Sequence, residues 1–277
     1  MDTEEIMALA LEMAGLDEIP GDSGIHNPGK EIKNVLIGID MQLPEMLLAK
    51  ELNFDLVIAH HPPGGTSRIN FEKVVETQID QMIEAGISPH IAEKAIQPRL
   101  EAVKMRTHVS NYDHNISAAK LLDIPYMNIH LPLDLICRRR FTEAIKKGTE
   151  KIDNPRVSDA IESMMELPEM KLGMTEPVVY VGSSSNLLGK WTVGMAGGTN
   201  GGAGVAMAYF NAGFSTVFYM HLGTSDAKEL KKEDNAGNLI ATGHMSSDSV
   251  GIAPFVKALR EKGLEVTPMS GVFVPED

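Results

Sequence analysis

Cysteine is almost absent from this sequence, since Cys137 is the single cysteine among 277 residues. One thiol cannot form an internal disulfide, and it cannot build a zinc site from several thiolates. Basic residues are also scarce relative to acidic ones: 25 Lys and Arg stand against 38 Asp and Glu, for a formal net charge of −13. Such a surface repels phosphate backbones, so we expect no nucleic-acid partner. An anionic small molecule would need a local positive centre such as a metal ion.

An apolar run long enough to cross a membrane is lacking as well. Residues 191–225 contain no Asp, Glu, Lys or Arg. Asn200, Asn211 and several glycines nevertheless interrupt this stretch before the ~20 continuous apolar residues of a membrane span accumulate. We therefore expect buried core there and no membrane partner. The first five residues are acidic and lack the basic and apolar regions of a signal peptide, which predicts a cytoplasmic location.

The remaining composition is that of an ordinary globular protein, with 43% hydrophobic and 23% charged residues. Apolar runs of strand length over 34–40 and 55–59 flank a helical segment over 44–52, which indicates a βαβ unit with a parallel sheet. Residues 72–105 show helical periodicity, for which we expect breaks near Gly86, Pro89 and Pro98. A second alternating region of strands and helices begins near residue 178.

These patterns predict an α/β fold of two related lobes, with mostly parallel sheets flanked by helices. The first lobe is expected to cover residues 1–135 and the second residues 136–277. A last strand over 264–267 is expected, and we predict that residues 244–277 pack back on the first lobe.

Histidines gather where predicted strands end. His60 and His61 directly follow a buried strand, and ligands of open α/β sheets bind beyond the carboxyl ends of strands. Two neighbouring imidazoles at the end of a strand can bind two adjacent metal ions. The alternative is that they are capping or partly buried histidines without a ligand.

His244 occupies the same kind of position after a later strand, and Asp248 follows four residues on. If a helix begins near Ser246, the two side chains share one helix face and suit Zn, Mn or Fe. The alternative is that Asp248 only favours the positive N-terminus of that helix.

A third cluster lies in the polar segment 107–115, which contains His108, Asp113 and His114. Asp113 could cap the following helix, or its two oxygens could bridge two metal ions. His108 or His114 could carry a proton in catalysis. Three clusters of suitable ligands, each at the boundary of an element, favour a metal site over three coincidences.

A glycine-rich segment over 194–204 follows a predicted strand and opens a predicted helix, with Gly197, Gly198 and Gly201 as candidate contacts. Its backbone N–H groups could hold a phosphate, although it lacks the Lys-Ser/Thr ending of a P-loop. The alternative is a tight turn that lets the helix pack closely on the sheet.

In their order along the chain, these motifs resemble the NIF-three-like (NGG-interacting-factor-like) family, also named GTP cyclohydrolase type-two-like proteins. The resemblance rests on Gly38-Ile39-Asp40, on Asp55 to His60-His61-Pro62, on Thr107-His108 with Asp113, and on Gly243-His244 with Asp248. It also includes Gly21-Asp22-Ser23-Gly24, which is similar to the N-terminal loop of the family. The resemblance implies two related α/β lobes, a dinuclear metal centre between them and hexameric rings. It assigns metal binding to His60, His61, Asp113, His244 and Asp248, and places His108 near the metals.

The sequence departs from the family pattern in four places. Asp248 stands where the family usually has Glu, and His108 and Asp113 are five residues apart instead of four. The segment between His61 and His108 is longer and more helical than usual. His221 stands near the position of the family's Thr-Gly-Glu segment, either as an additional site residue or as a strand-end histidine.

Together the residues and the resemblance predict a dinuclear metal-binding protein with two divalent ions (Zn, Fe, Mn or Ni). Its expected activity is metal-dependent hydrolysis of a small nucleotide-like or cyclic-amide substrate. A non-catalytic metal-binding or regulatory scaffold is the alternative, and a nucleotide-binding protein that uses residues 194–204 without metal is a third possibility. We expect a homo-oligomer, which the resemblance specifies as a hexamer.

Overall fold

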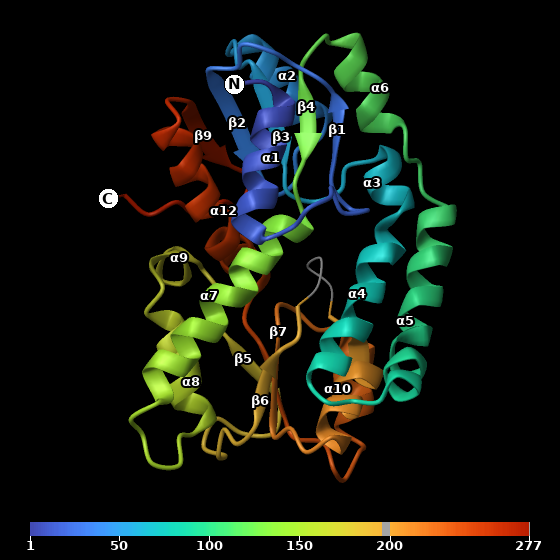
Figure 1. Cartoon of the computed structure of the whole chain (residues 1–277), viewed down its shortest axis with the longest axis vertical. Coiled ribbons are helices and arrows are strands. Elements are labelled where there is room, and N and C mark those ends of the chain that lie inside the picture. The colour runs from blue at the N-terminus through green and yellow to red at the C-terminus, as the bar shows by residue number, and fades with distance from the viewer. Residues whose placement is uncertain (196–199, 277) are drawn as a thin grey trace.

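The computed structural model describes residues 1–195 and 200–276 and contains two β-sheets, one in each of two lobes stacked along the long axis of the molecule (Figure 1). The expected α/β class, with two lobes and mostly parallel sheets, is confirmed. In the described part of the chain, no helix is both long enough and apolar enough to cross a membrane.

The first sheet has five strands in the order β1-β4-β3-β2-β9. Its strands are β1 (Gly24–Asn27), β2 (Asn34–Gly38), β3 (Leu56–Ala59), β4 (Tyr126–Asn128) and β9 (Glu265–Met269). The pairs β2–β3, β3–β4 and β2–β9 are parallel, whereas the edge strand β1 is antiparallel to β4. The last strand of the chain therefore lies in the sheet that the first strands build.

The second sheet has four strands in the order β5-β8-β7-β6. They are β5 (Val178–Val181), β6 (Trp191–Val193), β7 (Thr216–Tyr219) and β8 (Asn238–Ala241). Here β6, β7 and β8 are parallel and the edge strand β5 is antiparallel to β8. Numbered within its own half, each sheet thus has the order 1-4-3-2 with an antiparallel first strand, so the two lobes repeat one topology.

Helices cover both faces of the first sheet. One face packs on α1 (Thr3–Ala14), α7 (Leu131–Thr149) and α12 (His244–Glu261), and the other packs on α2 (Leu43–Glu51) and α6 (His114–Leu121). Helix α1 begins directly after Asp2, because Asp2 and Glu5 form a reciprocal capping box. This three-layer arrangement buries the apolar strands from both sides, which is the usual environment of parallel strands.

The second sheet is covered in the same way. One face packs on α4 (Phe71–Glu84), α5 (Pro89–His108) and α10 (Gly202–Asn211), and the other packs on α7 and α8 (Val157–Met165). The short helices are α3 (Gly65–Ile69), α9 (Pro168–Leu172) and α11 (Thr224–Leu230). Helix α7 contributes core residues to both lobes and runs obliquely from one to the other (Figure 1).

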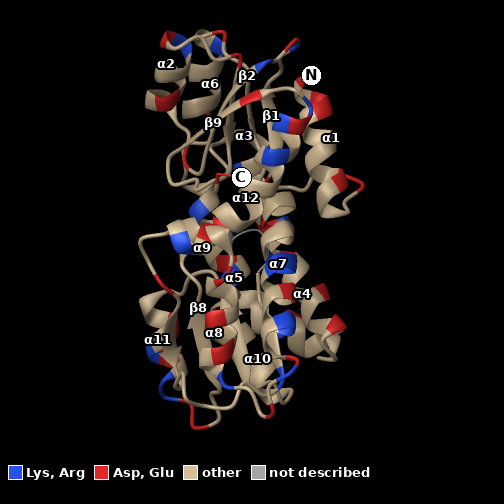
Figure 2. Cartoon of the chain, turned by 90° about the vertical axis from the view of Figure 1, so that its left-hand side faces the viewer, with Lys and Arg blue, Asp and Glu red and all other residues tan. Residues whose placement is uncertain are grey.

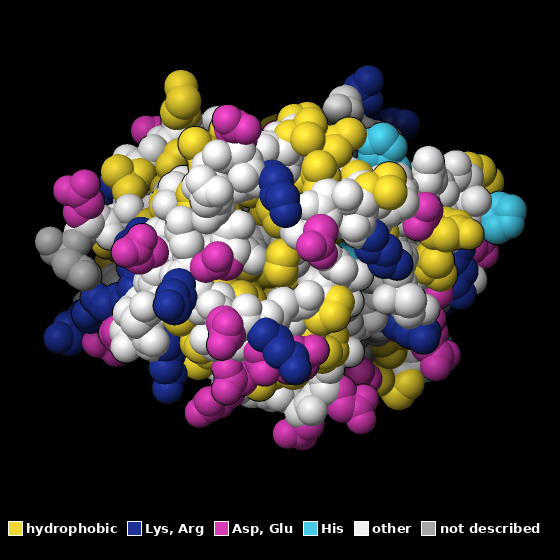
Figure 3. Space-filling view, turned by 90° about the horizontal axis from the view of Figure 1, so that it is seen from above, with side chains coloured by type: hydrophobic (Ala, Val, Ile, Leu, Met, Phe, Trp, Pro, Cys, Tyr) yellow, Lys and Arg dark blue, Asp and Glu magenta, His cyan; other side chains and the backbone are white. Residues whose placement is uncertain are grey.

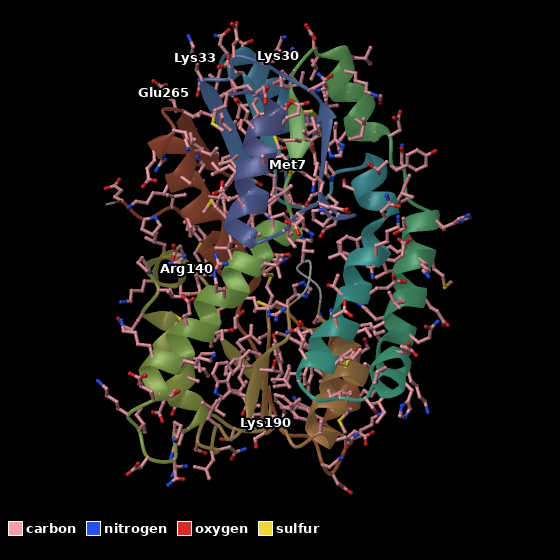
Figure 4. All side chains as sticks on the ribbon, viewed as in Figure 1. Met7, Lys30, Lys33, Arg140, Lys190 and Glu265 are labelled. Carbon is pink, nitrogen blue, oxygen red and sulfur yellow. The ribbon has the colours of Figure 1, made fainter. Side chains whose placement is uncertain are left out.

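Contacts cross the boundary expected at residue 135 in both directions. Strand β9 pairs with β2 of the first sheet, while α4 and α5 share a core with α10 beside the second sheet. Within residues 136–277, Arg140 on α7 (labelled in Figure 4) joins two further helices, since its guanidinium donates to Glu169 on α9 at 2.8 Å and to the carbonyl of Val250 on α12 at 2.6 Å. The position of the boundary itself stays a prediction.

The break expected at Pro98 is wrong. Pro98 lies inside α5, which continues to His108, whereas the break near Gly86 and Pro89 does separate α4 from α5. Pro98 is exposed, so the carbonyl whose helical hydrogen bond it removes can be hydrated, and packing of Ala92, Ile96 and Val103 holds the helix together.

Lys, Arg, Asp and Glu residues occur along the ribbon of both lobes (Figure 2). The view down on the first lobe shows acidic, basic and hydrophobic side chains interspersed on that face (Figure 3).

Candidate metal centre

The candidate metal centre begins at the end of β3. The chain continues in register with the loop after β2, because the N–H of His60 donates to Gly38 and that of His61 donates to Ile39. The ring of His60 is 1% exposed, and that of His61 is 24% exposed. The ring centroids of the two imidazoles are 5.4 Å apart. His60 therefore lies in the buried part of the cluster and His61 in its accessible part.

Two helices that follow equivalent strands supply the carboxylates. His130 precedes the first residue of α7 after β4, and Asp134 lies one turn into that helix. His244 begins α12 after β8, and Asp248 lies one turn later. The two lobes thus present the same His-x-x-x-Asp arrangement at corresponding strand ends, where a spacing of four puts both side chains on one helix face.

A close approach of α7 and α12 brings these carboxylates together. A Cβ atom at Gly251 of α12 would overlap the carbonyl oxygen of Leu133 on α7. Gly251 is one turn from Asp248, and Leu133 directly precedes Asp134. The absence of a side chain at residue 251 therefore sets the distance between the two helices next to the cluster.

Nitrogen and oxygen atoms converge in two groups that share Asp248. In the first group, Nε2 of His60 lies 3.3 Å from Oδ1 of Asp134 and 3.6 Å from Oδ1 of Asp248. In the second group, Oδ2 of Asp248 lies 3.6 Å from Nε2 of His61 and 3.5 Å from Nε2 of His244. The two oxygens of Asp248 thus face different sets of imidazoles.

Several buried polar atoms of this cluster complete no hydrogen bond with any residue that the structure describes. They are Nε2 of His60 and both carboxylate oxygens of Asp134 and of Asp248. Two carboxylates in a site that excludes water cost several kcal/mol unless a positive partner compensates them. A divalent cation would satisfy all of these atoms at once, so the residues present fit a metal.

A second set of contacts orients the imidazoles. Nδ1 of His60 donates to the carbonyl oxygen of Ile129 at 3.0 Å, and Nδ1 of His61 donates to Asp40 at 2.9 Å. Each bond fixes the tautomer in which Nε2 faces the cluster as an acceptor, which is the form that binds metal.

His130 is held in the same manner at the edge of the cluster. Its Nδ1 donates to buried Asp22 at 2.8 Å, and its Nε2 lies 3.6 Å from Asp134. His130, His60 and His61 also form one group of metal-capable side chains.

Charge interactions shift the pKa values of the cluster strongly. Burial lowers the pKa of His60, but the negative charges of Asp248 and Asp134 outweigh burial and raise it well above its ordinary value. Burial likewise opposes protonation of His61, yet its contacts with Asp248 and Asp40 raise the pKa to about 9. Burial lowers the pKa of His244. Without a metal cation, protonated His60 and His61 therefore supply the positive charge beside the carboxylates.

Burial alone would raise the pKa of Asp248, but the neighbouring imidazoles, His60 foremost, hold it well below its ordinary value. Asp248 is therefore ionised at neutral pH and available as an anionic ligand.

Four of the five predicted metal ligands come together, namely His60, His61, His244 and Asp248. The structure does not bring Asp113 to them: it is exposed at the N-cap of α6, and no group of metal-capable side chains in the described residues includes it. Asp134 stands in the cluster instead. The signal for it in the sequence is the pair His130 and Asp134, four residues apart after an apolar extended segment, which is the spacing that His108 and Asp113 lack.

The two histidines predicted to be catalytic lie in different places. His108 is exposed at the end of α5, and His114 is exposed at the start of α6. His114 lines a cavity of about 320 Å³ together with His61 and Asp40.

The glycine-rich segment is described only in part, and Gly197 and Gly198 lie outside the described residues. Gly201 is the N-cap of α10, and a Cβ atom there would overlap Val205 and lie 2.5 Å from the side-chain oxygen of Gln78. Close packing of α10 on α4 therefore requires glycine at residue 201.

A cavity of about 340 Å³ opens beside the cluster. His61, His130 and His244 line it, and so does His221, whose ring centroid lies 4.8 Å from that of His244. His221 is therefore a neighbour of the cluster, and Asn200 donates to its carbonyl oxygen at 2.8 Å. The accessible edge of the cluster faces a space of the size that small-molecule ligands occupy.

Comparison with known proteins identifies the family. The family described as Duf34/NIF3 (NGG1p interacting factor 3) matches residues 21–92. The crystal structure of a NIF3 superfamily protein from Sphaerobacter thermophilus is 43% identical to this chain, covers 98% of both chains and superimposes with a TM-score of 0.94. The chain belongs to the NIF3 family.

Two further proteins are similar over nearly the whole chain. A protein from Pyrococcus horikoshii named GTP cyclohydrolase 1 type 2 homolog is 24% identical over 95% of this chain and 94% of its own length. The reduced form of HcgD from Methanocaldococcus jannaschii is 16% identical over 97% of both chains, with a TM-score of 0.56. This last likeness concerns the fold alone.

Proposed function

We propose that this NIF3 protein binds two divalent metal ions and uses them to hydrolyse a small nucleotide-like or cyclic-amide substrate. The observation that carries the proposal is the position of Asp248, whose two oxygens face separate groups of imidazoles within a buried set of atoms that lack partners among the described residues. A carboxylate in this position can bridge two cations.

The two ions would have different ligands. His60, Asp134 and Asp248 would hold the buried ion. His61, His244 and Asp248 would hold the ion next to the cavity. Imidazole and carboxylate ligands without thiolates suit Zn, Fe, Mn or Ni, and the ligand set does not distinguish among them.

Two adjacent divalent ions, when bound, supply Lewis acidity for a carbonyl or phosphoryl oxygen and a water molecule of lowered pKa. The residues of the chain would orient the metal-binding imidazoles and transfer protons. Asp40 holds the ring of His61, and Asp22 holds that of His130. His130, whose Nε2 is near Asp134 and which lines the cavity, is placed to accept or return a proton. His114 could exchange protons with solvent in the second cavity beside His61.

The cavity supports catalysis over a purely structural role. A metal site that only stabilises a fold is usually closed by protein ligands, whereas a catalytic site keeps a position open to water or substrate. Here His61 and His244 line a cavity of about 340 Å³. A non-catalytic scaffold remains the competing proposal, and it would bind the same ions without turnover.

Elemental analysis of the purified protein tests the metal centre. We expect about two metal ions per chain, with loss of metal in His60→Ala and in His244→Ala. His90→Ala is the matched control, because His90 is exposed on α5 and belongs to no group of metal-capable side chains in the described residues. Unchanged metal content in both cluster variants would overturn the assignment.

A substrate panel tests the enzyme. Nucleotides, phosphoesters and cyclic amides are incubated with the protein before and after chelator treatment, and we expect turnover that the chelator abolishes and metal restores. Absence of chelator-sensitive turnover on every compound would favour the scaffold. The proposal includes a cytoplasmic homo-oligomer, with six subunits as the resemblance implies, and light scattering after size exclusion measures the subunit number.

A further inference from the structure

One wall of the cavity beside the candidate metal centre is positively charged. Three arginines line it: Arg68 comes from α3, and Arg99 and Arg106 come from α5. Arg99 and Arg106 are seven residues apart, which is about two helical turns, so both project from the same face of α5. Two elements therefore direct guanidinium groups into the cavity that His61 and His244 also line.

These arginines form no ion pair in the described part of the chain. The arginine that does pair with a carboxylate there is Arg140, which contacts Glu169. The described residues that line the cavity include no Asp or Glu. In a protein of net charge −13, a cavity wall with three arginines and no carboxylate has the opposite sign to the molecule as a whole.

Arg99 shows that this positive charge is partly removed from water. Its Nε atom is buried and makes no hydrogen bond to a described residue. Burial, and next the charge of Arg106, lower the pKa of Arg99. The charge of Asp226 opposes this lowering without cancelling it. An anionic ligand in the cavity would supply the remaining compensation.

We propose that Arg68, Arg99 and Arg106 form an anion subsite that binds a phosphate or diphosphate group of the substrate, with the reacting group placed at His61 and His244. The inference rests on the proposed function and names its substrate class: a phosphorylated small molecule, not a neutral cyclic amide. The planar donors of arginine match phosphate oxygens in pairs, and three positive charges suit a group that carries two or more negative charges.

The subsite comes from a distinctive part of the sequence. Arg68, Arg99 and Arg106 all lie between His61 and His108, the segment that is longer and more helical than the family pattern. The metal cluster and the anion subsite are thus separate pieces of the chain that meet at one cavity, and they can be altered independently.

Binding of inorganic pyrophosphate tests the subsite. The probe chelates metals, so isothermal titration is carried out on the chelator-treated full chain. We expect saturable binding that weakens by about 10- to 100-fold in Arg99→Gln and in Arg106→Gln, the effect of losing one charge-assisted hydrogen-bond donor to an anion. Arg106 is exposed, so Arg106→Gln keeps the test valid if Arg99→Gln fails to fold. Arg138→Gln alters an arginine of α7 that lines another cavity, makes the same change of charge and should bind pyrophosphate as the unaltered chain does.

The result separates this inference from the metal centre. Metal content is measured in parallel, and the arginine variants should keep it because none of the three arginines belongs to the cluster. If replacement of His60 left the metal content unchanged, the proposed function would be wrong. Pyrophosphate binding that is absent, or equal in all arginine variants, would overturn the anion subsite alone.

Discussion

Oδ1 of Asp248 lies 3.6 Å from the ring nitrogen of His60, and Oδ2 lies 3.5 Å from that of His244. The side chain of Asp248 is short, so its backbone must lie close to both histidines. Gly251, one turn away on α12, lets this helix approach α7 closely. The position of the backbone therefore brings the short carboxylate between the two imidazoles.

Amide substitutions of the carboxylates should change metal stoichiometry in steps. We expect Asp134→Asn to lose the buried ion and keep about one metal per chain, and Asp248→Asn to lose both, since Asp248 belongs to both groups. Asp113→Asn should retain both ions, because Asp113 is exposed on α6. Elemental analysis of the three variants measures this. Metal loss in Asp113→Asn equal to that in Asp134→Asn would contradict the assignment of ligands.

A change of pH should affect the folding stability of the metal-free protein and the stabilisation by bound metal in opposite directions. Without metal, the pKa of His61 is raised to about 9 and that of His60 is raised well above its ordinary value. A pKa raised on folding stabilises the fold fully below the unfolded value of about 6.5, and this stabilisation is lost as the pH rises through the folded value. The lowered pKa of His244 acts below about pH 6.5 and does not alter this window.

We therefore expect the melting temperature of chelator-treated protein to fall between about pH 6.5 and pH 9. The stabilisation by added metal should grow over the same range, because metal requires neutral imidazoles. Thermal unfolding at several pH values measures both, with His61→Gln as the variant that should flatten the slope of the metal-free protein. A metal-free melting temperature that rises with pH in this window would refute the assigned charges.

Some residues of the site could be predicted from sequence and others could not. His60, His61 and His244 follow apolar runs, so their place at strand ends is visible in the pattern. Asp134 was not predicted as a ligand, because residues 107–115 contain more polar side chains that could bind a metal. The spacing of four between His130 and Asp134 is nevertheless visible in the sequence. The partnership of Asp40 with His61 could not be foreseen, since it depends on how two neighbouring strands end.

At the scale of the element, the contact between α7 and α12 governs the centre. An alanine in place of glycine ordinarily stabilises a helix interior by roughly 1 kcal/mol. At residue 251 we expect the reverse, a loss of about 1–3 kcal/mol, because the added Cβ would overlap the carbonyl of Leu133. Metal affinity should also fall, since the overlap separates Asp134 from Asp248.

Denaturant unfolding and metal titration of Gly251→Ala measure these two effects. Gly24→Ala is the control, because a Cβ there meets only His26, at an ordinary 3.6 Å. If Gly251→Ala proved as stable as the unaltered chain and bound metal equally well, the helix contact would not set the geometry of the centre.

The elements themselves were largely predictable. Buried strands such as β2 and β3 correspond to the apolar runs of the sequence, because a parallel strand covered on both faces carries almost no polar residue. The edge strand β9 instead begins with alternating exposed and buried residues. Helix limits were less predictable. Helix α5 continues through Pro98, since tertiary packing on α10 outweighs the loss of one hydrogen bond on an exposed face.

At the scale of the whole molecule, the proposed metal ligands follow strands of both sheets, so bound ions should hold the two lobes together. Metal at 100 times its dissociation constant adds about 2.7 kcal/mol of stability if it binds only the folded chain. For a chain of this size we expect the melting temperature to rise by about 5–8 °C on reloading the chelator-treated protein. Scanning calorimetry measures the shift, which should vanish in Asp248→Asn. A full shift in that variant would place the metal elsewhere.

The repeated topology has one more consequence. Counted from the start of each third strand, Met220 corresponds to His60 and His221 corresponds to His61, while both His-Asp pairs keep the spacing of four. The two halves thus differ at one imidazole of the candidate centre, and the side at His60 is buried whereas the side at His61 is more exposed. If two ions bind as proposed, we expect the inner ion to exchange slowly and the outer ion to exchange rapidly.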